Sequence, residues 1–568
     1  MPAPIGNLSG LKANQLARLE RLFRRRVPVE RVITPELARI CTELSHEIRR
    51  QIGLLINRRG TVEAVIVGTD RQLVLPTLSR SRSGPRLLRG VRLVHTHLKN
   101  QPLTKDDLTD LALLRLDLMV AIGVGVDGGP ADVFVAHLLP QNPQGKAYEE
   151  LKPCGFHAFQ MDCGQFVQSL ESEISKVTST LRVTEDRPTA ILVSVSTGNR
   201  AVQEERLEEL RDLACSLGIH VLGSTVQRPH EINPRYMLGS GRIREVIIHA
   251  LQCGAEMLMF DQDLTPTQIR TISELTEMKV LDRTQLILDI FSRRTHTRGG
   301  KIQVELAQLQ YLLPRLSQSS TAFSRLGGGI GGRGPGETKL ETDLRRVRDR
   351  VAHLERELHM LARHRDQQRL MRVRRGVPVV SIVGYTNAGK STLLNVLTGS
   401  TVSVRNRPFE TLDTVNRRFR LPNGREVILT DTVGFLRDLP EGLVRAFRTT
   451  LEELHEADLL VHVVDASAPD SDGQIKAVET ILSGLEVDGI PQILVFNKCD
   501  RVSREEAHTL CRRRHGIGIS AIQPETLGPL RLALEEALAR VKPDEQWPCS
   551  AVAGRDTKVS PVPEVIAS

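Results

Sequence analysis

The sequence predicts an α/β protein. A domain with a mainly parallel sheet lies near the C-terminus, after a small α/β domain and an antiparallel helical hairpin, and a further α/β domain begins the chain. Three observations support this prediction. Apolar β-like runs alternate with helical segments before residue 290, two heptad-spaced runs follow, and a strand, a glycine-rich loop and a helix come next.

The composition indicates a cytoplasmic protein of several domains. At 568 residues, three or four domains are expected, each large enough to bury its own core. Lys and Arg number 77 against 68 for Asp and Glu, and the formal net charge of +9 is compatible with RNA. The eight cysteines include no C-x-x-C pair, so we interpret them as reduced intracellular thiols. Because the start lacks a signal-peptide run and no apolar stretch reaches about 18 residues, we expect a soluble protein without a membrane span. We also expect a monomer.

Residues 1–187 are expected to form an N-terminal extension that combines a basic helix with an α/β module. The helix covers residues 11–26 and is amphipathic. It could contact RNA, or its basic side could simply be the solvated face of a packed helix.

The α/β module contains a candidate metal site. His95 and His97 precede Thr104 and Asp107, which resembles the H-x-H…S-x-x-D zinc site of JAMM-type metallopeptidases, with Glu63 as its glutamate. Two histidines and a carboxylate bind Zn²⁺ in such a site and leave one position for water.

Two departures weaken this resemblance. Leu98 stands where the metallopeptidases carry proline, and the spacing from His97 to Thr104 is one residue short. A degenerate, structural copy of the fold is therefore the favoured interpretation, and an active metal site is the alternative.

Residues 188–290 are predicted to form the small α/β domain. Its expected strands cover residues 189–195, 219–222 and 257–260, and its helices cover 204–217, 242–253 and 265–275. Gly239 and Gly241 could bind an anion at a helix start, but a structural turn is the favoured interpretation.

Residues 291–376 are predicted to form the helical hairpin. The first heptad seam comprises Ile302, Leu306, Leu309, Leu313 and Leu316, and the second comprises Leu344, Val347, Val351, Leu354, Leu358 and Leu361. Residues 326–336, between the seams, are so rich in glycine that neither helix nor strand would be stable there. They are expected to form the tip of the hairpin.

Basic residues accompany the glycine-rich tip: Arg293, Arg294, Arg298, Lys301, Arg325 and Arg333. A helical packing domain would explain the heptads, but it would not explain so large a glycine loop beside these charges. A mobile cationic loop suits RNA phosphates, which a glycine backbone can approach closely.

Residues 377–541 begin with a phosphate-binding pattern. An apolar run at 377–383 precedes the spacing G-x-x-x-x-G-K-S, and a helical segment follows. The pattern comprises Gly384, Tyr385, Thr386, Asn387, Ala388, Gly389, Lys390 and Ser391, with Thr392 next in the chain. Its glycines let backbone N–H groups face phosphates, Lys390 neutralises the outer phosphates, and the Ser391 hydroxyl can bind Mg²⁺. An ordinary strand–helix turn is the alternative, but the flanking pattern favours a nucleoside triphosphate site.

A second segment supplies groups for the γ-phosphate. It follows a predicted strand at 427–430 and comprises Asp431, Thr432, Val433 and Gly434. Asp431 can hold the water shell of the magnesium ion, and the backbone N–H of Gly434 can contact the γ-phosphate.

Two later segments select the base. Asn497, Lys498 and Asp500 follow the apolar run 493–496, and Ser520 and Ala521 come after them. Asp500 can accept hydrogen bonds from the N1 and amino groups of guanine, a donor pair that adenine lacks. A backbone N–H near Ser520 could contact the guanine oxygen. Four segments in this order indicate a GTPase.

These motifs resemble the TRAFAC class of GTPases, and Phe409, Glu410 and Thr411 resemble its switch I. The resemblance implies that Thr411 is a second hydroxyl ligand of Mg²⁺ beside Ser391 and closes over the γ-phosphate. A solvated loop threonine is the alternative.

The expected catalytic residues are Lys390, Thr411 and Gly434. Phe435 stands where Ras-type GTPases carry a glutamine that orients the attacking water. Phenylalanine cannot form that hydrogen bond, so we expect slow intrinsic hydrolysis and a partner that completes the site.

Residues 233–241, 299–309 and 334–343 resemble motifs of the HflX family of ribosome-associated GTPases, over about residues 188–541. The resemblance implies GTP or GDP and Mg²⁺ as cofactors, and binding to the large ribosomal subunit and its RNA near the peptidyl-transferase centre. It also implies that the protein dissociates or rescues stalled or idle ribosomes. Residues 542–568 are expected to be a disordered tail. The alternative is a GTP-controlled RNA-binding scaffold in ribosome assembly, whose N-terminal module performs separate chemistry.

Overall fold

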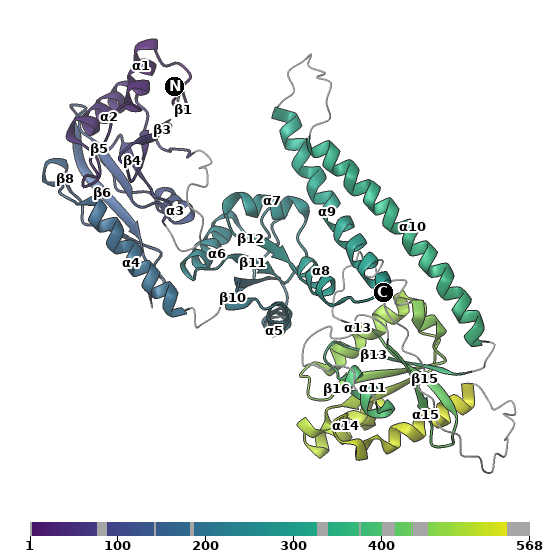
Figure 1. The fold of residues 1–568 in the computed structure, drawn as a ribbon. Helices are drawn as coiled ribbons and strands as arrows, with labels where there is room; N and C mark the ends of the chain where they lie inside the picture. The colour runs from purple at the N-terminus through teal and green to yellow at the C-terminus, as the bar shows by residue number, and fades with distance from the viewer. Residues whose placement is uncertain are drawn as a thin grey trace, which may run out of the picture. The chain divides into compact units, whose positions relative to one another are not determined.

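The computed structural model describes residues 3–75, 88–140, 142, 144–181, 187–326, 339–373, 377–399, 415–432, 434–435 and 452–541. Its contacts divide the chain into two compact units, Met1–Arg293 with Ala307–Val351, and Arg294–Leu306 with Ala352–Ser568. Three sheets with flanking helices make up the described fold, which confirms the α/β class (Figure 1). No described helix has the length and apolar character needed to cross a membrane.

The first unit contains an eight-stranded mixed sheet of order β1-β3-β2-β4-β5-β6-β7, with β8 paired to β6. Its strands are β1 (Ile5–Gly6), β2 (Ile52–Asn57), β3 (Val62–Val67), β4 (Val91–His97), β5 (Met119–Val124), β6 (Pro130–Leu138), β7 (Tyr148–Glu150) and β8 (Cys154–Gly155). Its helical elements are α1 (Ala13–Leu22), α2 (Pro35–Ile48), α3 (Lys105–Leu114), η1 (Phe156–Ala158) and α4 (Cys163–Leu181). Strands β4 and β5 run parallel and are buried throughout. β5 is apolar along its length, as burial on both faces requires, whereas β4 also buries Arg92, His95, Thr96 and His97.

The basic helix at the N-terminus packs against this sheet. Leu19 and Leu22 of α1 lie in the apolar core, and Arg18 forms an ion pair of 2.6 Å with Glu47 of α2. These contacts favour the interpretation of α1 as a packed helix with a solvated basic side.

A second, four-stranded sheet follows in the same unit, with all strands parallel in the order β10-β9-β11-β12. Its strands are β9 (Thr189–Val195), β10 (His220–Gln227), β11 (Met257–Phe260) and β12 (Lys279–Asp282). Its helices are α5 (Arg200–Ser216), α6 (Ser240–Gln252), α7 (Pro266–Leu275) and α8 (Arg283–Arg294). The predicted alternation of strands and helices is therefore present, and β12 and α8 extend it.

Two long helices, α9 (Arg298–Leu326) and α10 (Lys339–Val373), run antiparallel (Figure 1). Arg298, at the start of α9, pairs with Glu357 of α10 at 2.5 Å. The α9 segment of the first unit is tied to the second sheet, because the Tyr311 hydroxyl donates to buried Asp282 and Arg315 Nη2 lies 2.9 Å from the same carboxylate. The predicted glycine-rich tip at 327–336 lies outside the described residues, as does the tail at 542–568.

The second unit contains a six-stranded sheet of order β14-β15-β13-β16-β17-β18, in which only β14 is antiparallel to its neighbour. Its strands are β13 (Val379–Gly384), β14 (Val415–Arg420), β15 (Glu426–Asp431), β16 (Leu459–Asp465), β17 (Gln492–Asn497) and β18 (Ile517–Gly518). Its helical elements are α11 (Lys390–Thr398), η2 (Glu452–Glu456), α13 (Ser471–Gly484), η3 (Cys499–Arg501), α14 (Arg504–Arg514), η4 (Pro524–Leu527) and α15 (Gly528–Val541). The carboxyl ends of its parallel strands share one edge, where α/β sheets bind ligands.

Candidate nucleotide site

The phosphate loop connects β13 to α11, and two glycines permit its path. Gly384 has φ of +149°, and a Cβ there would lie 2.2 Å from the carbonyl oxygen of Val463 on β16. Gly389 has φ of +92°, and a Cβ there would lie 2.3 Å from Asn497 Nδ2. Side chains at either position would therefore collide with neighbouring strands or loops.

Lys390 opens α11 beneath the loop. Its side chain is buried, and Nζ donates to the backbone carbonyls of Gly384 at 3.0 Å and Tyr385 at 2.8 Å. Burial lowers the pKa of Lys390 to about 8, and the negative charge of Asp431 partly opposes this shift. The ammonium group is thus held within the loop, where it would exchange carbonyl partners for phosphate oxygens.

Several side-chain oxygen atoms that could bind a metal ion lie next to this lysine. Ser391 Oγ donates to Asp431 Oδ2 at 2.7 Å, and Asp431 is fully buried at the end of β15. Thr432 follows and donates its hydroxyl to the carbonyl of Ile382 at 2.7 Å. Mg²⁺ prefers hydroxyl and carboxylate oxygens as ligands, so the Ser391 hydroxyl and the Asp431 carboxylate suit this ion. Thr392 lies in the first turn of α11.

Gly434 lies beside the phosphate loop. A Cβ on Gly434 would lie 3.1 Å from Lys390 Nζ and 2.9 Å from Thr386 Cγ2. Phe435 joins the loop through its backbone, since Thr386 N–H donates to the Phe435 carbonyl at 2.8 Å and Phe435 N–H donates to the Gly384 carbonyl at 3.1 Å. The Phe435 side chain is 1% exposed. It fills the interior and offers no hydrogen bond to a water molecule.

The base-selecting residues lie at the ends of β17 and β18. Asn497 is buried, its Nδ2 donates to the carbonyl of Ala388 at 2.8 Å, and its Oδ1 accepts from the backbone N–H of Ala521 at 2.9 Å. Ser520 Oγ donates to Asp500 Oδ1 at 2.6 Å, which fixes the orientation of that carboxylate. Asn387 and Ala388 of the phosphate loop are thereby held close to the segment that would contact a base.

Asp465 is a part of this site that the sequence analysis missed. Its Oδ2 lies 2.7 Å from Lys498 Nζ, and its Oδ1 accepts from Ser467 N–H at 2.9 Å and Oγ at 2.6 Å. Lys498 itself has φ of +61°. The missed signal was an aspartate at the carboxyl end of the apolar run that forms β16, the same position that identified Asp431 on β15.

The remaining predicted site residues cannot be placed. Phe409, Glu410, Thr411 and Val433 lie outside the described residues. The other seventeen predicted nucleotide-site residues lie at the carboxyl ends of β13, β15 and β17, in the segments that follow these strands and β18, or in the first turn of α11.

The predicted metal-site residues of the first sheet are only partly brought together. His95, His97 and Asp107 form one cluster whose ligand atoms lie within 4.8 Å of one another. Glu63 is exposed on β3 and accepts from Asn57 Nδ2 at 3.0 Å. Its neighbour Ala64 pairs with Leu55, whereas His95 pairs with Gly53, so Glu63 lies towards the other end of the strands. The prediction that Glu63 completes this site is wrong.

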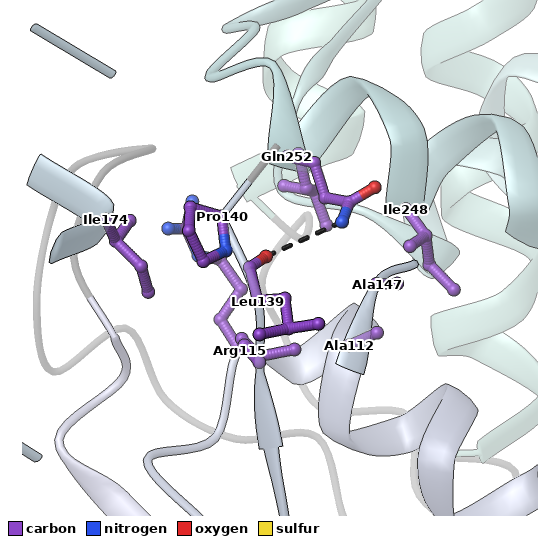
Figure 2. Close-up of a pocket in the computed structure, with 10 residues that line it drawn as sticks. Ala112, Arg115, Leu139, Pro140, Ala147, Ile174, Ile248 and Gln252 are labelled. Carbon is purple, nitrogen blue, oxygen red and sulfur yellow. Dashed lines mark hydrogen bonds between the residues drawn. The ribbon is translucent and has the colours of Figure 1, made fainter. Parts of the chain in front are cut away.

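A small pocket lies in the first unit. It is lined by residues that include Arg115, Leu139, Ile174 and Gln252, and Gln252 Nε2 donates to the Leu139 carbonyl at 3.5 Å (Figure 2). Its volume of about 30 Å³ corresponds to one or two water molecules. Burial lowers the pKa of Arg115 to about 10.

The third sheet and the phosphate loop at its carboxyl edge are those of a P-loop GTPase domain. Three family models match the chain, described as a GTP-binding GTPase N-terminal region at residues 204–292, a GTP-binding GTPase middle region at 294–372 and a 50S ribosome-binding GTPase at 379–498. The GTPase HflX of Caldanaerobacter subterraneus is 49% identical over 315 residues, which cover 56% of this chain and 73% of that relative. The chain belongs to the HflX family of GTPases, and it is a GTP hydrolase.

Two further comparisons concern a curated relative and a solved structure. The GTPase HflX of Escherichia coli K12 is 43% identical over 309 residues, which cover 53% of this chain and 72% of that protein. A solved GTP-binding protein of Sulfolobus solfataricus in complex with GDP matches 62% of this chain and 100% of its own, at 24% identity and a TM-score of 0.35. The three family models leave residues 1–203 unmatched.

Proposed function

We propose that this protein binds the large ribosomal subunit in its GTP form, dissociates or rescues stalled or idle ribosomes, and leaves when GTP has been hydrolysed. Membership of the HflX family supports a ribosomal partner, as does the match to a 50S ribosome-binding GTPase model. Such a partner would place the protein in the cytoplasm, where we expect it to act as a monomer.

The observation that carries the nucleotide part of this proposal is the pair of hydrogen bonds made by Asn497. One side chain holds both the phosphate loop, at Ala388, and the base-contacting segment, at Ala521. Asp500 would then read the N1 and amino groups of guanine, and Lys390 with the backbone of residues 384–389 would hold the phosphates. Mg²⁺, bound by Ser391 and Thr411, would neutralise charge that develops on the phosphates.

The hydrolytic step has a gap that a partner would fill. Efficient GTPases hold the attacking water with a hydrogen-bonding side chain, but the side chain of Phe435 is buried and apolar. Gly434 can still offer its backbone N–H to the γ-phosphate, next to Lys390. We therefore propose slow basal turnover and stimulation on the ribosome.

Sedimentation with ribosomes would test this function. The full chain should pellet with 50S subunits and 70S ribosomes in the presence of a non-hydrolysable GTP analogue and remain in the supernatant with GDP. Light scattering should then show loss of 70S particles. Binding without loss of 70S particles would favour the alternative of an RNA-binding scaffold, and the absence of GTP-dependent binding would overturn the proposal.

A loop replacement gives a sharper version of the same experiment. Residues 327–336 would be replaced by a short Asn-Gly turn, which should preserve basal GTP hydrolysis because the nucleotide-binding segments all follow residue 376. Ribosome-stimulated hydrolysis and ribosome splitting should fall sharply. Wild-type splitting by a folded, GTP-binding variant would show that this segment is only a connector.

A further inference from the structure

Three potential metal ligands meet in the first sheet domain, at the end of β4 and in the first turn of α3. The Nε2 atoms of His95 and His97 are 2.9 Å apart, and each lies 3.5 Å from an oxygen of Asp107. The imidazoles are at most 1% exposed, whereas the Asp107 side chain is 15% exposed. The cluster is therefore buried on the histidine side and reachable from solvent on the aspartate side.

The spacing of these atoms resembles that of ligands around a common centre. A tetrahedral ion with bonds of about 2.0–2.2 Å holds its ligand atoms about 3.3–3.6 Å apart. The two distances between Asp107 and the histidines fall in this range, and the distance between the histidines would need to open by about 0.4 Å. Side-chain rotation of this size is ordinary when an ion binds.

The surrounding hydrogen bonds prepare the ligands. His97 Nδ1 lies 2.8 Å from the backbone carbonyl of Gln101, which can only accept, so this nitrogen carries the proton and Nε2 presents its lone pair. Asp107 Oδ2 accepts from Thr104 N–H at 2.8 Å and from Thr104 Oγ at 2.7 Å. Both contacts hold ligand groups in place from outside the cluster, which is the usual arrangement around a bound metal.

A bound cation would also change the hydrogen bonding of the His95 ring. Without one, and with both rings neutral, His95 Nε2–H donates to His97 Nε2, and His95 Nδ1 is then a buried acceptor with no donor among the described residues. With a cation bound by both Nε2 atoms, His95 would carry its proton on Nδ1 instead. Both Nε2 lone pairs would then be used.

We infer that His95, His97 and Asp107 form a binding site for one zinc-class divalent metal ion, with a fourth position open to water. Two imidazoles and one carboxylate suit Zn²⁺ or Co²⁺, whereas Ca²⁺ and Mg²⁺ require mainly oxygen ligands. The ion would join the end of β4 to the start of α3 across residues 98–104. Glu63 lies towards the other end of the strands and pairs with Asn57, so it does not act as a general base at this site.

Metal analysis of the full-length chain would test this inference. The protein would be stripped with a chelator, reloaded separately with Zn²⁺ and Co²⁺, and passed through gel filtration in nucleotide-free buffer. We expect one equivalent of metal per chain, and a Co²⁺ spectrum typical of tetrahedral nitrogen and oxygen ligands without a thiolate band. His97→Ala and Asp107→Asn should weaken binding by about 100-fold or more.

Matched substitutions control for general effects. His157→Ala and Asp106→Asn change exposed residues of the same types and should leave the one equivalent in place. If the ligand variants fail to fold, zinc-edge X-ray absorption of the wild-type protein should show two imidazoles and no sulfur. No stoichiometric metal, sulfur ligands, or equal binding by His97→Ala and His157→Ala would each overturn the inference.

Discussion

The side-chain amide of Asn497 donates a hydrogen bond of 2.8 Å to the backbone carbonyl of Ala388. Because the same side chain accepts from the N–H of Ala521, it couples the phosphate loop to the segment proposed to contact the base. The two halves of the nucleotide site are therefore not independent. Nucleotide affinity should depend on Asn497 although no role in phosphate chemistry is assigned to it.

Asn497→Asp removes the donor and places a negative charge against a carbonyl oxygen. We expect affinity for GTP and GDP to fall together, by about 1–3 kcal/mol, because both nucleotides use the base and the loop. Titration with fluorescent GTP and GDP analogues would measure this. Asn423→Asp, at an exposed position on the same unit, is the control and should bind normally. A loss confined to GTP would contradict the coupling.

The base preference should change with Asp500→Asn. The new amide can donate to the C2 oxygen of xanthine, so GTP affinity should fall by about two orders of magnitude and affinity for xanthosine triphosphate should rise. Competition binding with GTP, ATP and xanthosine triphosphate would measure the change. Asp488→Asn replaces an exposed aspartate and serves as the control. Unaltered GTP affinity would remove Asp500 from the base-recognition site.

The phosphate loop could be predicted from sequence because its chemistry requires particular residues at particular spacings. Gly384 is required by its close approach to the Val463 backbone, and Gly389 by its positive φ and its closeness to the Asn497 side chain. Lys390 and Ser391 are placed by the start of one helix. Asp465 has the same local signal as Asp431, an aspartate that ends an apolar strand. Its contact with Lys498, however, depends on the pairing of β16 with β17, which the sequence around Asp465 does not specify.

The candidate metal cluster of the first sheet was likewise predicted correctly only where local sequence spacing determines the structure. The spacing of His95 and His97 on one strand placed both on one face, and the capped start of α3 brought Asp107 to them. Glu63 was wrongly included, because its distance from His95 depends on the register of β2, β3 and β4. Sequence spacing alone does not determine that register.

Rates of GTP hydrolysis should distinguish the role of Lys390 from that of Phe435. Lys390→Ala should lower kcat by at least about 10²–10³-fold, because it removes the charge next to the transferred phosphate. Phe435→Leu keeps most of the buried volume and should leave the slow basal rate within about twofold, since no hydrogen bond is lost. Single-turnover hydrolysis at saturating GTP would measure both.

The size of the replacement at Phe435 matters. The Phe435 side chain is 1% exposed, so truncation to alanine would cost about 3–5 kcal/mol of stability and confuse the measurement of turnover. The leucine variant avoids this effect. A large fall in the single-turnover rate of a stable Phe435→Leu protein would show that the ring itself contributes to hydrolysis.

Acid stability should depend on His462, in the middle of β16. Neither ring nitrogen has a hydrogen-bond partner in the part of the chain that the structure describes, and burial, together with the charge of Lys390, lowers its pKa from 6.5 to about 4. As pH falls from 6.5 to 4, the unfolded chain gains a proton at this site that the folded chain does not. Stability should therefore fall by about 3 kcal/mol across that window on account of this residue.

His462→Leu should remove this dependence. The leucine leaves no unpaired polar group, so stability near pH 7 should be unchanged or higher, and the fall in Tm between pH 6.5 and 4 should be shallower than in the wild type. Calorimetry of the full chain would follow the transition that GDP shifts upward, which belongs to the nucleotide-binding unit. His508→Leu, at an exposed position of the same unit, should retain the wild-type pH dependence. If the two variants lose Tm equally with acid, His462 is charged in the folded protein and its burial does not control acid stability.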